Sequence, residues 1–187
     1  INIILSRVEG PEAVTQYNIA YKYFNVLNMV FVIVLTPFWS AFTDAYVKKD
    51  YNWMSGIVKK LEFLWLLCIP ILILMVLCSN FFYQWWVGNS VSISFSLSIC
   101  MAVFMFFYTS ANLYMILING TSMVCLQLII NVCFAIISLP CICLFCRLWG
   151  VQGALLIPTV TLAVLTLIGK IQIMKIVNNR ATGIWQR

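Results

Sequence analysis

The chain has 187 residues, of which 64% are hydrophobic and 9% charged, with a net charge of +6 and a mean hydropathy of +1.02. Soluble domains are usually about 45–50% apolar and about 25% charged, so this chain cannot cover a water-exposed surface. The 84 residues between Glu62 and Arg147 contain no charged side chain. The composition excludes a soluble globule, a disordered tail and a nucleic-acid-binding domain, and it indicates an integral membrane protein.

The residue types present also limit the chemistry. The chain has no histidine, so the commonest general base and metal ligand is missing. Its eight cysteines lie in apolar runs, and even the closely spaced Cys141, Cys143 and Cys146 have neighbours that favour packing over metal binding. We therefore expect no metal site, no cofactor and no enzymatic activity; the alternative, a membrane enzyme, would need an acid–base pair or an acidic metal-binding motif at the interface.

Hydropathy predicts an all-α, polytopic transmembrane helix bundle, because a helix needs about 20 apolar residues to cross the bilayer. Residues 1–5 are too short and are interpreted as the tail of a preceding span, followed by a polar loop at 6–14 that contains Gly10 and Pro11. A basic connector is expected at 46–60 and a short turn at 84–92. Five full spans are predicted, at about 17–46, 61–83, 93–118, 124–146 and 154–176.

The distribution of Lys and Arg predicts the orientation. Five full spans place the two ends of the chain on opposite sides of the membrane, with eight basic residues on the side of the C-terminus and three on the other. We therefore expect the C-terminus to be cytoplasmic, residues 1–178 to form a transmembrane lobe and residues 179–187 a cytoplasmic tail. Because the chain opens on Ile1 without a signal peptide, we expect it to be the C-terminal part of a longer protein.

The first full span carries the clearest pattern. At about 100° per residue, its polar side chains fall on one face, with Asn28 at the border. A polar stripe in a membrane helix faces either other helices or a water-filled cavity, because lipid offers no hydrogen-bond partners. The two hypotheses are lining of a cavity and hydrogen bonding that holds helices together. The candidate lining residues are Asn18, Tyr21, Lys22, Asn25, Thr36, Ser40 and Thr43.

Two charged residues on this helix have both functional and ordinary interpretations. Lys22 either extends its ammonium to the headgroup region or binds an anionic group such as a pyrophosphate. Asp44 either binds a coupling cation or proton, or forms a solvated pair with Lys48 four residues later.

The run TPFWSAFTDAYVKKDYNW at 36–53 resembles the eighth helix and following loop of bacterial polysaccharide-repeat flippases. These are the Wzx-type branch of the multidrug/oligosaccharidyl-lipid/polysaccharide exporter superfamily. Further stretches agree in order, namely YNIAYKYFNV at 17–26, Asn119-Gly120 with Gln127, and the segment from Gly150 to Gly153 that leads to Ala181–Trp185.

The resemblance implies that this chain is the C-terminal lobe of a MATE-like twelve-helix transporter in the bacterial cytoplasmic (inner) membrane. It implies that the protein flips undecaprenyl-pyrophosphate-linked oligosaccharide repeat units for surface polysaccharide such as the O-antigen of lipopolysaccharide. The implied partners are this lipid-linked oligosaccharide, membrane lipids and an N-terminal lobe of the same protein. The alternatives are a cation-coupled multidrug exporter of the same superfamily and a non-functional truncated remnant.

Overall fold

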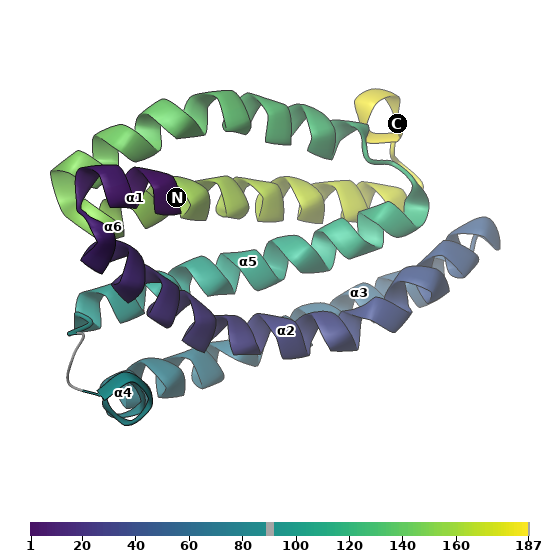
Figure 1. Ribbon diagram of the computed structural model, residues 1–187. Helices are drawn as coiled ribbons and strands as arrows, with labels where there is room; N and C mark the ends of the chain where they lie inside the picture. Colours follow the sequence, from purple (N-terminus) through teal and green to yellow (C-terminus); the bar gives the residue numbers. More distant parts are fainter. Residues whose placement is uncertain (89–91, 187) are drawn as a thin grey trace.

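The computed structural model describes residues 1–88 and 92–186, and within them it contains helices and no strand, so the prediction of an all-α fold is confirmed. A short 3-10 helix, Gly183–Gln186, follows the last α-helix. The α-helices are α1 (Asn2–Val8), α2 (Pro11–Val47), α3 (Tyr51–Leu66), α4 (Cys68–Val87), α5 (Phe95–Thr121) and α6 (Cys125–Val177) (Figure 1).

Four helical segments of the described chain are long and apolar enough to cross a membrane. Helices α3 and α4 form one of them together, because only a bend at Leu67 separates the two. The four segments are Pro11–Val47, Tyr51–Val87, Phe95–Thr121 and Cys125–Val177. The chain is therefore a membrane protein with several spanning helices.

Helix α6 reverses its direction halfway. A straight helix of 53 residues would be about 80 Å long, far more than the hydrocarbon core of about 30 Å. The helix breaks at Trp149 and Gly150, where Gly150 has a φ of +60°, and Figure 1 shows the second half running back in the opposite direction. A Cβ atom at Gly153 would overlap the carbonyl oxygen of Phe145, so only glycine fits beside this turn.

The expected loops are shorter than the sequence suggested. The prediction of a polar loop at 6–14 is wrong, since only Glu9 and Gly10 separate α1 from α2. Gly10 adopts a φ of +93°, which favours glycine, and Pro11 then occupies the first position of α2, where its missing N–H costs no hydrogen bond.

The predicted basic connector at 46–60 is also mostly helical, because only Lys48 to Asp50 lie between α2 and α3. The Asp50 carboxylate accepts a hydrogen bond from the backbone N–H of Trp53 at 3.0 Å and so caps α3. In the predicted turn at 84–92, α4 continues to Val87, and positions 89–91 lie outside the described residues.

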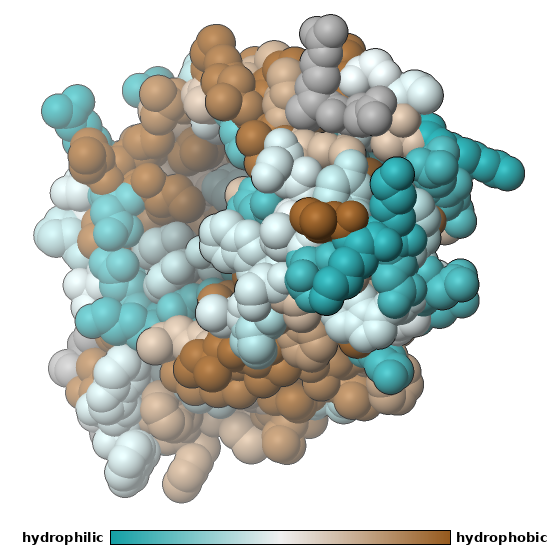
Figure 2. Space-filling view, turned by 90° about the vertical axis from the view of Figure 1, so that its right-hand side faces the viewer, coloured by the Kyte–Doolittle hydropathy of each residue, from teal (hydrophilic) through white to brown (hydrophobic). Residues whose placement is uncertain are grey.

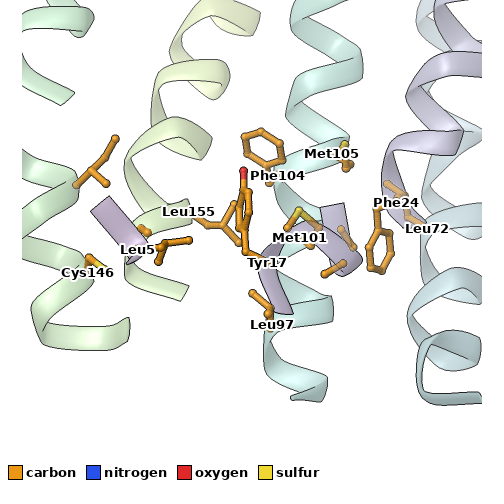
Figure 3. Close-up of a cluster of buried hydrophobic side chains, with 14 of the residues drawn as sticks. Leu5, Tyr17, Phe24, Leu72, Leu97, Met101, Phe104, Met105, Cys146 and Leu155 are labelled. Carbon is orange, nitrogen blue, oxygen red and sulfur yellow. The ribbon is translucent and has the colours of Figure 1, made fainter. Parts of the chain in front are cut away.

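Helix α5 is the central element of the fold and packs against α2, α4 and α6. One core cluster joins α1, α2, α5 and α6 near the α1–α2 connection, where Leu5, Tyr17, Met101 and Leu155 converge (Figure 3). A second cluster lies toward the opposite ends of α2 and α5 and includes Phe42, Leu117 and Ile173.

The connections between helices lie at two opposite ends of the bundle. The α2–α3 and α5–α6 connections and the C-terminus lie together at one end, and the α1–α2 connection and the α6 reversal lie at the other (Figure 1). Figure 2 faces the first of these ends and shows hydrophilic side chains across it, with hydrophobic side chains above and below. We call this the C-terminal end of the bundle.

The last residues pack back onto this end. The Lys175 ammonium lies 3.7 Å from the centroid of the Trp185 ring, and the Gln172 side chain donates hydrogen bonds to the carbonyl oxygens of Met123 (2.9 Å) and Trp185 (3.5 Å). The segment expected as a cytoplasmic tail is therefore docked on α6 as far as it is described, whereas Arg187 lies outside the described residues.

Candidate functional site

The candidate site is the polar face of α2. The helix buries an apolar face that includes Ala20, Phe24, Phe31, Leu35 and Phe42. These residues recur at helical spacing, so they fix the rotation of α2 against the bundle. The structure divides the predicted polar stripe into two parts with different surroundings.

The first part of the stripe contacts other helices. Asn18 accepts a hydrogen bond from Asn2 of α1, with 3.3 Å between the amide nitrogen and the oxygen. Asn28, at the border of the stripe, is 7% exposed. Its side-chain amide donates to the Asn25 oxygen at 3.3 Å, and its own oxygen accepts from Asn112 of α5 at 2.9 Å. We call Asn25, Asn28 and Asn112 the asparagine ladder, and it links α2 to α5 within the bundle.

Tyr21 and Lys22 lie beside the asparagine ladder but point to different surroundings. Tyr21 is half-buried, and its ring packs on Tyr17 of the same helix and on Phe104 of α5, with centroid distances of 6.0 and 6.5 Å. Lys22 is exposed and makes no ion pair with any residue that the structure describes.

The second part of the stripe is open. Thr36, Ser40 and Thr43 are exposed, and their hydroxyl groups donate to carbonyl oxygens of their own helix at 2.8–3.2 Å. Each hydroxyl therefore satisfies its donor locally, while its lone pairs face outward. Together they line an open depression of about 640 Å³, which Trp39, Asp44 and Val47 complete. We call this depression the α2 groove.

Close packing behind the α2 groove holds its shape. Gly120 of α5 lies directly against this part of α2, where a Cβ atom would come within 3.1 Å of the Trp39 carbonyl oxygen and 3.3 Å of the Thr43 hydroxyl oxygen. Gly120 belongs to the last turn of α5, and its missing side chain allows the two backbones to approach.

Asp44 lies at the end of the α2 groove and pairs with Lys48. The carboxylate oxygen is 2.6 Å from the Lys48 ammonium, and both side chains are largely exposed. The hydrogen bond and charge of Asp44 raise the pKa of Lys48 above its ordinary value. Asp44 therefore forms the solvated i, i+4 pair with Lys48 that the sequence suggested as one of its two interpretations. Such exposed pairs contribute little to stability.

Sequence reasoning missed a polar cluster between α3, α5 and α6. The Tyr114 hydroxyl donates to the Glu62 carboxylate at 2.6 Å, and the Lys170 ammonium lies 3.3 Å from the same oxygen. Hydropathy did place Glu62 and Lys170 inside predicted spans. However, the positions are far apart in the chain, and no pattern in the sequence indicates that they meet.

Two other surface depressions contrast with each other. One of about 610 Å³ adjoins the α2 groove and is lined by Asp44, Lys48 and Asp50 among others. A depression of about 420 Å³ between α4 and α5 has a wholly apolar lining, including Leu72, Val76 and Val103. Among the described residues, no group of three His, Cys, Asp or Glu side chains could hold a metal ion.

Comparison with known proteins gave no match to any family model, curated protein or solved structure.

Proposed function

We propose that the chain is a lobe of a transporter that flips a polyprenyl-pyrophosphate-linked oligosaccharide across the bacterial inner membrane. The observation that carries the proposal is the α2 groove, a hydroxyl-lined depression on the outside of an apolar helical bundle. Lipid tails cannot hydrogen-bond such a surface, whereas a sugar headgroup in transit needs hydroxyl partners and water in place of its hydration shell.

The two parts of the stripe then have different roles. The asparagine ladder holds α2 on α5, so this part of the stripe fits the hypothesis of hydrogen bonding between helices. The α2 groove with Thr36, Ser40 and Thr43 remains for the hypothesis of a substrate passage. Lys22, exposed on the same face, supplies a cation for a pyrophosphate group.

A second helical bundle completes this passage. The resemblance over residues 36–53 assigns it to an N-terminal lobe of the same protein, so that the α2 groove faces the interior of a two-lobed, MATE-like transporter. In this arrangement we infer five membrane crossings, a count supported by the reversal of α6 at Gly150 (Figure 1). We also infer a cytoplasmic C-terminal end of the bundle, which the basic connection between α2 and α3 supports.

Complementation tests the function. The gene is deleted in the source organism, surface polysaccharide is measured by immunoblot, and lipid-linked repeat units in the membrane are measured by mass spectrometry. We expect the deletion to abolish the polymer and to accumulate repeat units, and the full-length gene to restore both. Normal polymer in the deletion strain would contradict the proposal, and an altered drug susceptibility in its place would favour the multidrug exporter.

Variants of the α2 groove connect the function to the site. We expect Thr36→Val combined with Ser40→Ala to lower polymer export, because hydroxyl groups are lost with little change in volume. The matched control is Ile33→Val on the same helix, an exposed apolar position outside the groove. Equal export by the groove variant, the control and the wild type at equal protein level would remove the groove from the mechanism.

A further inference from the structure

Helix α3 has an outward face that carries two lysines at the edge of an apolar surface. The buried residues of the helix recur at helical spacing and are Met54, Val58 and Leu61. At about 100° per residue, Lys59, Lys60 and Phe63 fall on the other side of the helix, and all three are exposed. The packing of the apolar face on the bundle therefore leaves two ammonium groups and one aromatic ring free on the outside.

The pair of Glu62 and Lys170 shows where this face meets the membrane boundary. The second half of α6 has no charged residue between Arg147 and Lys170, a run of 22 residues. At about 1.5 Å per residue this run is about 33 Å long, which matches a hydrocarbon core of about 30 Å. The Lys170 ammonium lies 3.3 Å from Oε1 of Glu62. Both side chains therefore lie at one level, at the boundary nearer to the C-terminal end of the bundle.

Helix α3 passes through this boundary. It begins at Tyr51, eleven residues before Glu62, so about three turns of the helix extend toward headgroups and water. In the other direction α3 and α4 carry no charged residue from Phe63 to Val87. Lys59 and Lys60 therefore lie at the level of the headgroups, where long basic side chains place their charge, and Phe63 begins the apolar part of the span.

The charges around Lys59 and Lys60 leave an excess of positive charge. Glu62 is paired with Lys170, and its carboxylate also accepts a hydrogen bond from the Tyr114 hydroxyl at 2.6 Å. Neither Lys59 nor Lys60 forms an ion pair with any residue that the structure describes. Three ammonium groups and one carboxylate make a net charge of +2 at this place.

The carboxylates of the α2–α3 connection do not neutralise this charge. Asp44 pairs with Lys48 at 2.6 Å, and the Asp50 carboxylate caps the first turn of α3. The start of α3 is eight residues before Lys59, which is about 12 Å along the helix. The two free lysines therefore attract an anion from outside the chain.

On the membrane side of the lysines the surface is apolar. Phe63 is 65% exposed. It follows Lys59 by four residues and Lys60 by three, so it lies one turn deeper on the same face. Leu66 and Ile71 continue the exposed apolar surface along α3 and α4. A molecule with a phosphate group above a hydrocarbon chain fits this succession of charge and apolar side chains.

We propose that α3 holds an anionic phospholipid of the adjoining leaflet, with its phosphate at Lys59 and Lys60 and an acyl chain against Phe63. Lysine binds phosphate as a point charge, and basic side chains beside a membrane span are attracted to anionic headgroups. A zwitterionic phospholipid has the same phosphate but also a cationic group, which the positive charge of this face repels. The inference goes beyond the proposed function and does not depend on the substrate.

Fluorescence quenching by brominated lipids tests the proposal. Leu66→Cys is introduced into the full-length protein, in a background from which all native cysteines have been removed, and is labelled with bimane. The protein is reconstituted into vesicles of phosphatidylglycerol and phosphatidylcholine in equal amounts, with one of the two lipids brominated. Because bromine quenches only fluorophores that it contacts, the two samples report which lipid lies beside Phe63. One lysine near the surface favours an anionic lipid about fivefold, so we expect quenching to show an enrichment of phosphatidylglycerol of at least about fivefold.

Two pairs of lysines distinguish a site from general surface charge. Lys59→Gln combined with Lys60→Gln removes both charges and is expected to lower the enrichment below about twofold. Arginine at both positions keeps the charges and is expected to keep the enrichment. The matched control is Lys48→Gln combined with Lys49→Gln in the α2–α3 connection, at least about 12 Å away along α3, and it is expected to leave the enrichment unchanged.

Three results would overturn the proposal. Equal quenching by the two brominated lipids in the wild type would show that no anionic headgroup is held at α3. An equal loss of enrichment in the control and in the glutamine variant of Lys59 and Lys60 would show general surface charge only. Loss of the enrichment in millimolar inorganic phosphate would assign the lysines to a free phosphate ion.

A salt titration of the wild type tests the proposal without any lysine variant. At about 1 M NaCl the screening length falls to about 3 Å, so the enrichment of phosphatidylglycerol is expected to fall several-fold. An enrichment that does not change with salt would contradict binding of the headgroup by charge.

Discussion

The close approach of α5 and the second half of α6 at Gly169 gives a prediction whose size follows from the geometry. Substitution Gly169→Ala places a methyl group 2.8 Å from the Cβ and 3.3 Å from the Cγ of Tyr114. The matched control is Gly56→Ala in α3, also inside a helix, where a Cβ atom would meet nothing within 4 Å. Both substitutions gain the same helix propensity, and only one of them creates a steric conflict.

The two contributions set the expected difference. Alanine is favoured over glycine in a helix interior by about 0.8–1.0 kcal/mol. Extra methyl groups in a packed core typically cost about 1–3 kcal/mol. We therefore expect Gly56→Ala to be neutral or slightly stabilising and Gly169→Ala to be less stable than Gly56→Ala by about 1–3 kcal/mol.

The measurement is the free energy of unfolding in mixed micelles, followed by circular dichroism during titration with a denaturing detergent. The two variants are compared with the wild type at the same lipid content. Equal unfolding free energies for both variants would refute the packing of α5 on α6 as described, and with it the fixed position of Tyr114 next to Glu62.

Three further predictions follow from other contacts. Asn28→Leu and Asn112→Leu, measured singly and together, are expected to show a coupling energy of about 0.6–1.7 kcal/mol in the unfolding free energy, the range for hydrogen bonds between membrane helices. Purely additive effects would contradict the asparagine ladder. Gly153→Ala is expected to push apart the two halves of α6 beside the turn and so to speed proteolytic cleavage near Arg147. An unchanged cleavage rate would disprove this. Lys175→Ala is expected to loosen the docked C-terminal segment by at least about 0.5–1 kcal/mol, the lower range for a cation–π contact. Hydrogen exchange of residues 181–185 that stays at the wild-type rate would rule this out.

Hydropathy predicted the helical class and the presence of several spanning helices, because apolar runs of about 20 residues have few other stable solutions in lipid. It was less successful at the helix ends. The segments around Gly10 and Asp50 were interpreted as loops because they are polar or contain Gly and Pro, yet these residues start helices. Gly10 supplies a positive φ before Pro11, and Asp50 caps the first turn of α3.

The periodicity of α2 predicted which residues share its polar face, and in the structure Thr36, Ser40 and Thr43 of that face are exposed. It could not predict that Asn25 joins a ladder to Asn112 while Ser40 stays open. Nor could it predict that Glu62 meets Lys170. Both outcomes depend on how distant helices pack, and a periodic pattern within one helix carries no information on its partners.

The proposed function requires that the α2 groove faces water within the membrane and not lipid. Single cysteines are introduced at positions 36, 40 and 43 of the full-length protein, in a background from which all native cysteines have been removed. Native membranes are then treated with a membrane-impermeant maleimide. Control cysteines at positions 30, 33 and 34 replace exposed apolar residues of the same helix. Because only the hydrated thiolate reacts, we expect the groove positions to be labelled at least about tenfold faster than the controls. Groove cysteines as unreactive as the controls would show that this face of α2 meets lipid.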